Sequence, residues 1–275
     1  MRPPPFAIAF AALALALAGC RPSSSTAGPE IATTTSYLEA AARDLLGDHL
    51  TVLRLTEPGT CPGHFDIRPS QVARLRRCRA LLRFDFQQSL DPKLAGTGAN
   101  APRIAPVTLS TGKSRPDSYL SACRQIADHL VALDLLPHAE ATRRLQTIAA
   151  RLDALARQAT QRVAQARLVG LPVIASSHQR DFCEWLGLDV VASFRPADTA
   201  SIGEIQEAID AGTLQQVRLV VANLPEGRRT ADALAGRLKT PVAVFENFPA
   251  LRHGSVSFDA MLQTNVAALL QSAAP

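Results

Sequence analysis

The chain has 275 residues, of which 47% are hydrophobic and 19% charged, so it is long enough to build two modest domains around real cores and has the composition of a soluble globular protein. Its net charge of +5 is modest, and its single Trp and two Tyr offer few rings for stacking on bases. Because the Lys and Arg residues are also scattered rather than clustered, the composition argues against nucleic-acid binding.

The N-terminus has the pattern of an export signal. Arg2 precedes an unbroken apolar stretch at residues 6–18, which is shorter than the roughly 20 residues that a membrane-spanning helix needs and is typical of a secretory signal. The letters LAGC that follow resemble a bacterial lipobox, in which Cys20 is acylated and becomes the mature N-terminus; a plain cleaved signal is the alternative. We expect residues 1–20 to be a lipoprotein signal peptide and the Ser- and Pro-rich residues 21–30 to be a flexible tether.

A long helix is expected at residues 138–168, which contain no Gly or Pro. Apolar residues recur there at spacings of three and four, which places one apolar stripe on one helix face. At about 1.5 Å per residue such a helix spans roughly 45 Å, more than the width of a small lobe. We interpret residues 137–168 as a linking helix between two α/β lobes, at residues 31–136 and 169–275.

The first lobe alternates predicted strands and helices. A short strand at residue 31 is followed by an amphipathic helix that ends at Gly47, a strand at residues 51–55, a helix opened by Pro69 and a strand at residues 80–84. This alternation predicts a parallel sheet with helical crossovers. Ligands of such sheets lie beyond the carboxyl ends of the strands, which is where the Pro- and Gly-rich loop places His64.

The second lobe repeats this pattern. Strands are expected at residues 171–175, 190–194, 219–222 and 242–245, and helices at residues 202–211 and 230–238. Ser201 and Glu204 predict a capping box at the start of one helix. His178 follows the first strand at the beginning of another helix, where the helix dipole favours the neutral imidazole that can bind a metal.

The cysteines leave several possibilities open. Export permits disulfides, but Cys61, Cys78, Cys123 and Cys183 allow three pairings between which the sequence does not choose. Cys78 and Cys123 fall within helical patterns and are expected to be buried small hydrophobes. A thiol enzyme that pairs Cys61 with His64, or Cys183 with His178, is one reading. However, no nucleophile elbow, Walker A loop or GxGxxG loop occurs, and we expect no catalysis.

Several segments together resemble one family. IATTTSYLEAAARDLLGDHLTVLRLTEPGTCPGHFDIRPS is similar to the opening of the metal-binding solute receptors of bacterial ABC importers, the zinc/manganese, TroA-like group, with matches at Pro58, Gly59, Pro62, His64, Pro69 and Ser70. The resemblance resumes with the long helix and with VIASSHQRDFCEWLGL, LVVANLPEGRRTADALAGRLKTPVAVFENFP and SVSFDAMLQTNVAALLQ. It covers most of the mature chain and implies two Rossmann-like lobes joined by a helical backbone.

The resemblance also implies metal ligands at His64, His178 and Glu246. The family's second ligand normally lies in a D-P-H-x-W segment, but the equivalent RPDSYLSACRQIADHL lacks a histidine at that place, and Asp117 is the nearest alignable side chain. Cys61 stands where the family has an aspartate. Asn223 stands where some members have another liganding acid.

Two imidazoles with one or two carboxylates suit Zn²⁺ and accept Mn²⁺, and raw affinity favours Zn²⁺. The implied function is capture of this ion between the lobes and its delivery to an ABC permease of the inner membrane. We expect a monomeric lipoprotein, anchored in a membrane and facing the periplasm or the cell surface. A receptor of the same fold for a metal chelate or a cobalamin-like ligand, and a degenerate adhesin-like member, are the alternatives.

Overall fold

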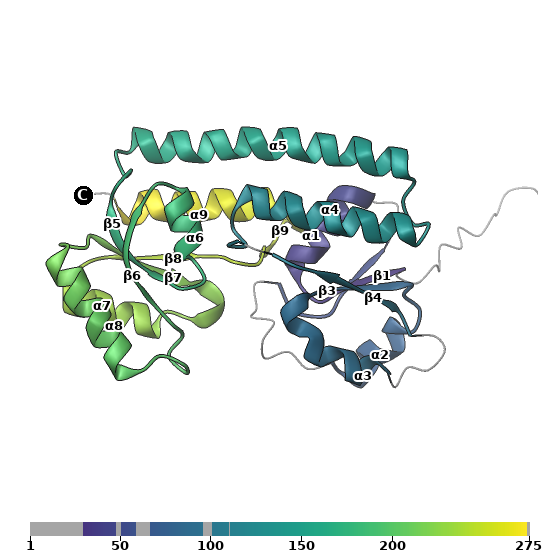
Figure 1. The fold of residues 1–275 in the computed structure, drawn as a ribbon, viewed down its shortest axis with the longest axis horizontal. Helices are drawn as coiled ribbons and strands as arrows, with labels where there is room; N and C mark the ends of the chain where they lie inside the picture. The colour runs from purple at the N-terminus through teal and green to yellow at the C-terminus, as the bar shows by residue number, and fades with distance from the viewer. Residues whose placement is uncertain (1–29, 48–50, 59–66, 96–100, 110, 274–275) are drawn as a thin grey trace, which may run out of the picture.

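Two parallel sheets and one long helix make up the fold (Figure 1). The computed structural model describes residues 30–47, 51–58, 67–95, 101–109 and 111–273. Cys20, Cys61 and His64, and residues 21–29 of the expected tether, lie outside this part. Within it, no helix combines the length and the apolar character needed to cross a membrane.

The first lobe holds a four-stranded parallel sheet in the order β2-β1-β3-β4. Its strands are β1 (Ile31–Thr33), β2 (Val52–Arg54), β3 (Ala80–Phe84) and β4 (Arg103–Val107). Its helices are α1 (Ser36–Leu46), α2 (Pro69–Leu75), η2 (Asp85–Leu90), α3 (Asp91–Ala95) and α4 (Pro116–Ala132). The strand at residues 80–84 is confirmed, and Gly47 ends α1 with a φ of 63°.

The second lobe has the same topology, with strand order β6-β5-β7-β8. Its strands are β5 (Pro172–Ser176), β6 (Asp189–Phe194), β7 (Leu219–Asn223) and β8 (Val242–Phe245), followed by a hairpin of β9 (Leu251–Arg252) and β10 (Ser255–Val256). Its helices are α6 (Arg180–Trp185), α7 (Ile202–Leu214), η4 (Leu224–Glu226), α8 (Arg229–Leu238) and α9 (Phe258–Ser272). The capping box of Ser201 and Glu204 is confirmed.

The linking helix α5 (His138–Gln165) runs along the same side of both lobes, above α4 and α9 (Figure 1). It ends three residues before the predicted residue 168 because Arg167 adopts a left-handed conformation, with a φ of 58°. Its buried stripe of Ile148, Leu152, Leu155, Ala159 and Val163 belongs to one hydrophobic core that includes residues of both sheets. The two lobes are therefore joined by shared packing as well as by the chain.

A polar cluster reinforces this junction. Two nitrogens of Arg151 on α5 donate to the carboxylate of Asp44 on α1, at 3.0 and 2.5 Å, and the hydroxyl of Tyr119 on α4 donates to the same carboxylate at 2.7 Å. The ring of Tyr119 stacks on Phe258 of α9, with 4.1 Å between the centroids. Helices from both lobes thus meet at one point beside α5.

Candidate metal site

The carboxyl ends of the strands in the second lobe bring three loops together. His178 lies after β5, Glu226 after β7 and Glu246 directly after β8. The strand order reverses between β5 and β7. From β5 the chain first adds β6 on one side of the sheet and then adds β7 and β8 on the other side. Ligands of parallel α/β sheets bind in the crevice at such a reversal. His178 and Glu226 therefore flank the position where this topology favours a ligand.

The imidazole of His178 is held by a partly buried carboxylate. Its Nδ1 contacts Oε1 of Glu226, whose side chain is 9% exposed, whereas the His178 side chain is 51% exposed. Glu226 also accepts a hydrogen bond from the hydroxyl of Ser176 at 2.8 Å and one from Nδ2 of Asn223 at 2.7 Å. Because a carboxylate faces Nδ1, a neutral imidazole carries its proton there and keeps the Nε2 lone pair for a ligand.

Glu226 stays ionised despite its burial. Burial by itself raises the pKa of this carboxyl group. The hydrogen bonds from His178, Asn223 and Ser176 together lower the pKa by more than burial raises it, so the pKa lies below the ordinary value. The group that orients His178 is consequently a charged acceptor. Such an acceptor fixes the tautomer of a histidine and makes its free nitrogen a better donor to a metal.

A network of buried amides locks the loops that carry these residues. Nε2 of Gln179 donates to Oδ1 of Asn223 and to Oδ1 of Asn247, each at 3.0 Å. Asn265 on α9 bonds both the backbone N–H of Glu246, at 2.7 Å, and its carbonyl, at 2.9 Å. The hydroxyl of Ser114, which belongs to the first lobe, donates to the same carbonyl at 2.9 Å. The backbone around the candidate site is thus fixed from both lobes.

Glu246 lies at the predicted strand end, but its carboxylate is already paired. Arg252 of the β9–β10 hairpin donates to its two oxygens, at 3.2 and 2.5 Å, and the Glu246 side chain is only 9% exposed. Among the described residues it makes no hydrogen bond or ion pair with His178. A metal that binds this carboxylate therefore competes with the arginine for its oxygens.

The carboxylate of Asp117 is also paired with an arginine. It lies in the first turn of α4, where the guanidinium of its neighbour Arg115 bonds both carboxylate oxygens, at 3.0 and 2.6 Å. The hydrogen bond with Arg115 is the main reason why the pKa of Asp117 is lowered. The side chain is 58% exposed, so the pair faces solvent. Asp117 and His178 make no hydrogen bond or ion pair with each other in the described part of the chain.

Sequence reasoning missed Glu226. Asn223, at the end of β7, was singled out as a position where a liganding acid is lacking, yet an acid follows three residues later in the same loop. Glu226 could have been found from the rule that the carboxyl ends of neighbouring parallel strands lie at the same edge of a sheet. This rule places the loops after β5 and β7 side by side. In the described residues, no group of three or more His, Cys, Asp and Glu side chains could hold a metal ion. His64 lies outside them.

The three thiols in the described part of the chain are not reactive groups of this site. Cys78, Cys123 and Cys183 are all free and buried. Burial raises the pKa of Cys183, which is the opposite of what a thiolate nucleophile beside His178 requires. Cys123 lies in α4 as expected, but the prediction of a helical Cys78 was wrong, because α2 already ends at Leu75. Burial also raises the pKa of Cys78, to about 11.

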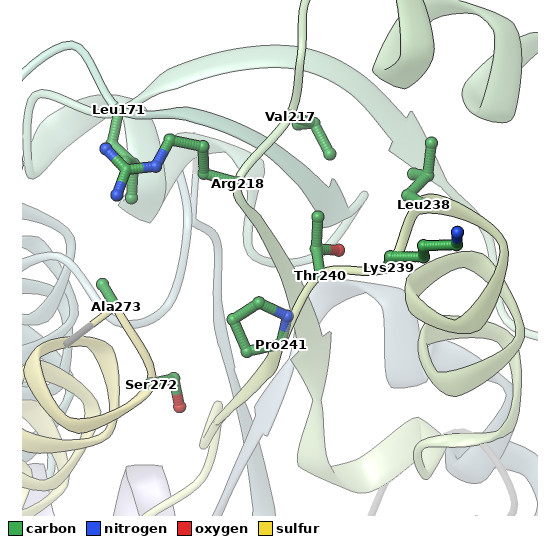
Figure 2. Close-up of a pocket in the computed structure, with 9 residues that line it drawn as sticks. All are labelled: Leu171, Val217, Arg218, Leu238, Lys239, Thr240, Pro241, Ser272 and Ala273. Atoms are coloured by element: carbon green, nitrogen blue, oxygen red, sulfur yellow. The ribbon is translucent and has the colours of Figure 1, made fainter. Parts of the chain in front are cut away.

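Two pockets lie at opposite edges of the second sheet. The larger, with a volume of about 970 Å³, is bordered by His178 and Glu226. The smaller, of about 350 Å³, lies at the amino ends of the strands, where Arg218 precedes β7 and Lys239 precedes β8. Figure 2 shows Arg218 extending towards Leu171 and Lys239 lying beside Leu238, so the two cations do not converge on one point. The larger pocket is therefore the better candidate for a ligand.

Solved structures share this fold. A crystal structure of ZnuA superposes with a TM-score of 0.74 at 16% identity, covering 90% of this chain and 100% of that one. The Mn-bound periplasmic metal binding protein from Candidatus Liberibacter asiaticus gives a TM-score of 0.73 at 11% identity, covering 89% of this chain and 99% of that one. None of the curated proteins compared with the chain matches it. The fold predicted from the sequence, two parallel-sheet lobes joined by a long helix, is confirmed.

The fold places the chain among two-lobed proteins whose parallel sheets are joined by one long helix. The particular family follows from the sequence. Residues 31–272 match the family model described as zinc-uptake complex component A, periplasmic (ZnuA). The chain belongs to this family, and the resemblance to zinc/manganese receptors is confirmed.

Proposed function

We propose that the protein is a periplasmic receptor that captures a divalent transition metal between its lobes and delivers it to an ABC permease. The observation that carries this proposal is the half-exposed imidazole of His178, whose Nδ1 is held by partly buried Glu226 at the strand reversal. Family membership supports it. So do the related structures described as a zinc-bound ZnuA deletion mutant and as Mn-bound and Cd-bound periplasmic proteins.

One buried acceptor next to His178 in the chain has no partner in the described part of the structure. Gln179 is fully buried, and its Oε1 has no hydrogen-bond donor among the described residues. A buried acceptor left open in this way is satisfied by a cation or by a bound water. We propose His178 and His64 as the first two ligands. Glu246 joins them once Arg252 is displaced, and Asp117 remains the weakest candidate because Arg115 occupies both of its oxygens.

The donor set favours zinc over manganese. Both carboxylate candidates are paired with arginine, so imidazole nitrogen is the donor that binds without breaking an ion pair. Imidazole suits Zn²⁺, whereas Mn²⁺ relies more on carboxylate and water oxygens. We therefore propose zinc as the preferred cargo and manganese as the second choice.

The decisive experiment is a metal titration of the soluble form that begins after Cys20. The metal-depleted protein is titrated with Zn²⁺ and Mn²⁺ by isothermal calorimetry, alongside His64→Ala and His178→Ala. His138→Ala is the matched control, since His138 is an exposed residue at the start of α5. We expect one tight equivalent of zinc that is lost in both ligand variants and kept in the control. Tight binding that survives His178→Ala would overturn the proposed ligand set.

The remaining parts of the proposal concern the rest of the chain. We propose a monomeric, non-enzymatic lipoprotein anchored through acylated Cys20, with a tether at residues 21–30, lobes at residues 31–136 and 169–275, and a linking segment at residues 137–168 that contains α5. Family membership supports the periplasmic location. Metabolic labelling with a radioactive fatty acid tests the anchor, because the label is expected in the wild type and absent from Cys20→Ala.

A further inference from the structure

One stretch of the first lobe departs from the otherwise scattered distribution of cations. Residues 74–79 read RLRRCR and contain four arginines, at the end of α2 and in the turn that leads into β3. A further arginine, Arg103, is the first residue of the neighbouring strand β4. We call this set the amino-edge cluster, because it lies where β3 and β4 begin; its members are Arg74, Arg76, Arg77, Arg79 and Arg103.

The backbone brings these arginines to one edge of the first sheet. Ala80 and Arg103 are register partners at the starts of β3 and β4, and the N–H of Arg103 donates to the carbonyl of Arg79 at 2.9 Å. The turn after α2 is closed by the N–H of Arg77, which donates to the carbonyl of Arg74 at 3.1 Å. The side chains of the cluster therefore start from neighbouring positions, although they come from two segments of the chain.

The guanidinium groups of this cluster are not neutralised by carboxylates. All of its members are exposed, and none forms an ion pair with another residue in the described part of the chain. The side chain of Arg79 donates to a backbone carbonyl, that of Leu133. Elsewhere, Arg83 and Arg228 pair with aspartates. An uncompensated group of guanidiniums suits a surface rich in phosphate, because each guanidinium can form paired hydrogen bonds with phosphate oxygens.

The cluster also adjoins the point where the chain enters the fold. β1 begins at Ile31, in register with the start of β3. The N–H of Arg79 donates to the carbonyl of Glu30 at 2.7 Å. The proposed tether at residues 21–30 can span at most about 35 Å. An acyl anchor at Cys20 therefore keeps the start of β1, and the arginines beside it, within that distance of the membrane.

We propose that the amino-edge cluster binds the headgroups of anionic phospholipids and holds this edge of the first lobe on the membrane. The inference rests on the lipid anchor of the proposed function, which brings the cluster to the surface. A basic patch next to an acyl chain strengthens membrane attachment, and each arginine near an anionic surface adds to the attraction. Because the strands are parallel, their carboxyl ends lie at the opposite edge of the sheet. Lipid bound at the cluster therefore leaves the carboxyl edge uncovered.

The test is sedimentation of the soluble form that begins after Cys20, which contains every described residue, with vesicles that hold no protein. Neutral vesicles consist of phosphatidylcholine, and anionic vesicles of phosphatidylcholine with phosphatidylglycerol. We expect binding to the anionic vesicles alone, weakened by added salt because salt screens exposed charges. The triple variant R74Q/R76Q/R77Q should bind these vesicles on the order of 100-fold more weakly. Its zinc affinity should equal that of the wild type.

A matched control removes three exposed arginines from other helices and so changes the net charge by the same amount. The control variant carries Arg124→Gln on α4, Arg157→Gln on α5 and Arg237→Gln on α8. We expect it to bind the anionic vesicles like the wild type. An equal loss in both triple variants would overturn the inference, because net charge rather than the cluster would then decide binding.

Other outcomes separate this inference from the proposed function. Equal binding to neutral vesicles, or no binding to anionic vesicles, would overturn the phospholipid contact and leave the metal receptor and its anchor standing. Failure of the zinc titration would refute the metal receptor without affecting vesicle binding. Absence of the fatty-acid label from the wild type would refute the anchor, and with it the route by which the cluster reaches the membrane.

Discussion

The carboxyl edges of the two sheets have the same topology and different chemistry. In the second lobe, amide and hydroxyl groups around Gln179 and Asn223 hold the His178–Glu226 pair in place. In the first lobe, the described part of the edge also holds buried polar groups, among them the Thr34 hydroxyl, which donates to Gln87 at 2.6 Å, and it adds a pair of aromatic rings. Phe84 at the end of β3 stacks on Phe86 at 5.2 Å, and the ammonium of Lys113 lies 5.3 Å from the centroid of the Phe86 ring. The second-lobe edge thus presents a half-exposed imidazole, whereas the rings of the first-lobe edge are covered by the protein's own cation.

The three carboxylates near the candidate site differ in the side chains with which they pair. Glu226 pairs with a histidine and thereby leaves that histidine's second nitrogen open, whereas Glu246 and Asp117 pair with arginines that occupy their own oxygens. An acid that orients a donor and an acid that is neutralised by a guanidinium have opposite consequences for metal binding, although both lie near strand or helix ends. The partner of each acid, rather than its position, decides its role.

The largest effect is expected where the two lobes share their core. Leu152 on α5 is 2% exposed and packs in the hydrophobic core that includes both sheets. Leu152→Ala should lower the free energy of unfolding by about 3 kcal/mol, in one transition that reports on both lobes. Urea denaturation followed by circular dichroism measures this. Leu214→Ala, at a residue that is 80% exposed on α7, should change it by less than about 0.5 kcal/mol. Two separate transitions would show that the edges are not held by one core.

The polar edge is tested next by Glu226→Gln. The uncharged amide accepts the Nδ1–H bond less strongly and can present its N–H₂ group to His178 instead, so the imidazole loses its fixed orientation. We expect the zinc affinity to fall about 10- to 100-fold, as for other partners of metal-binding histidines. Calorimetric titration measures the loss. Glu207→Gln, at an exposed residue of α7, is the control and should bind zinc like the wild type. An unchanged affinity in Glu226→Gln would remove this residue from the site.

Arg252→Gln tests whether the ion pair with Arg252 prevents Glu246 from binding a metal. Removal of the guanidinium leaves a carboxylate that is 9% exposed without its cation, so the metal-free protein should lose about 1–2 kcal/mol of stability. Zinc should then bind more tightly than to the wild type, because the metal replaces the missing positive charge. Denaturation with and without zinc separates these effects. If zinc affinity stayed the same while stability fell, Glu246 would be a structural residue and not a ligand.

Much of the fold could be predicted because hydrophobic pattern and capping signals are local. The strands at residues 80–84 and 242–245 and the capping box of Ser201 and Glu204 were all confirmed. By contrast, β4 went unrecognised, since Arg103 and Pro106 interrupt its apolar pattern. Pro106 is tolerated there because β4 is an edge strand, which requires fewer amide donors. The two-residue strands β9 and β10 are too short to show a period.

The site was harder to predict because its chemistry depends on contacts between distant residues. The sequence placed His178 and Glu246 at strand ends, as the structure does. It could not show that Glu226, 48 positions from His178 in the chain, holds the imidazole, or that Arg252 covers Glu246. These pairings arise only when β5, β7, β8 and the following hairpin are assembled. Whether His64, His178, Glu246 and Asp117 bind the metal stays a prediction for the titrations above.

The smallest expected effect concerns the exposed pair at the pocket rim. The hydrogen bond from Arg195, followed by the backbone N–H of Ser201, lowers the pKa of Glu204 to about 2. Arg195→Gln should raise this pKa towards the ordinary value of about 4.3, although the bond from Ser201 keeps it somewhat lower. NMR titration of the Glu204 side chain measures the change. Arg237→Gln, remote from this pair, should leave it at the wild-type value.

The sign of the linked pH effect follows from this shift. Since the pKa of Glu204 is depressed in the folded state, the stability it contributes is present above the unfolded pKa and is lost as pH falls towards about 2. The pair therefore holds Arg195 throughout the neutral range, but through one nitrogen only. If Arg195→Gln left the Glu204 pKa unchanged, Arg195 would not be engaged with Glu204 in solution. Its whole guanidinium would then be available to the pocket that Arg195 lines.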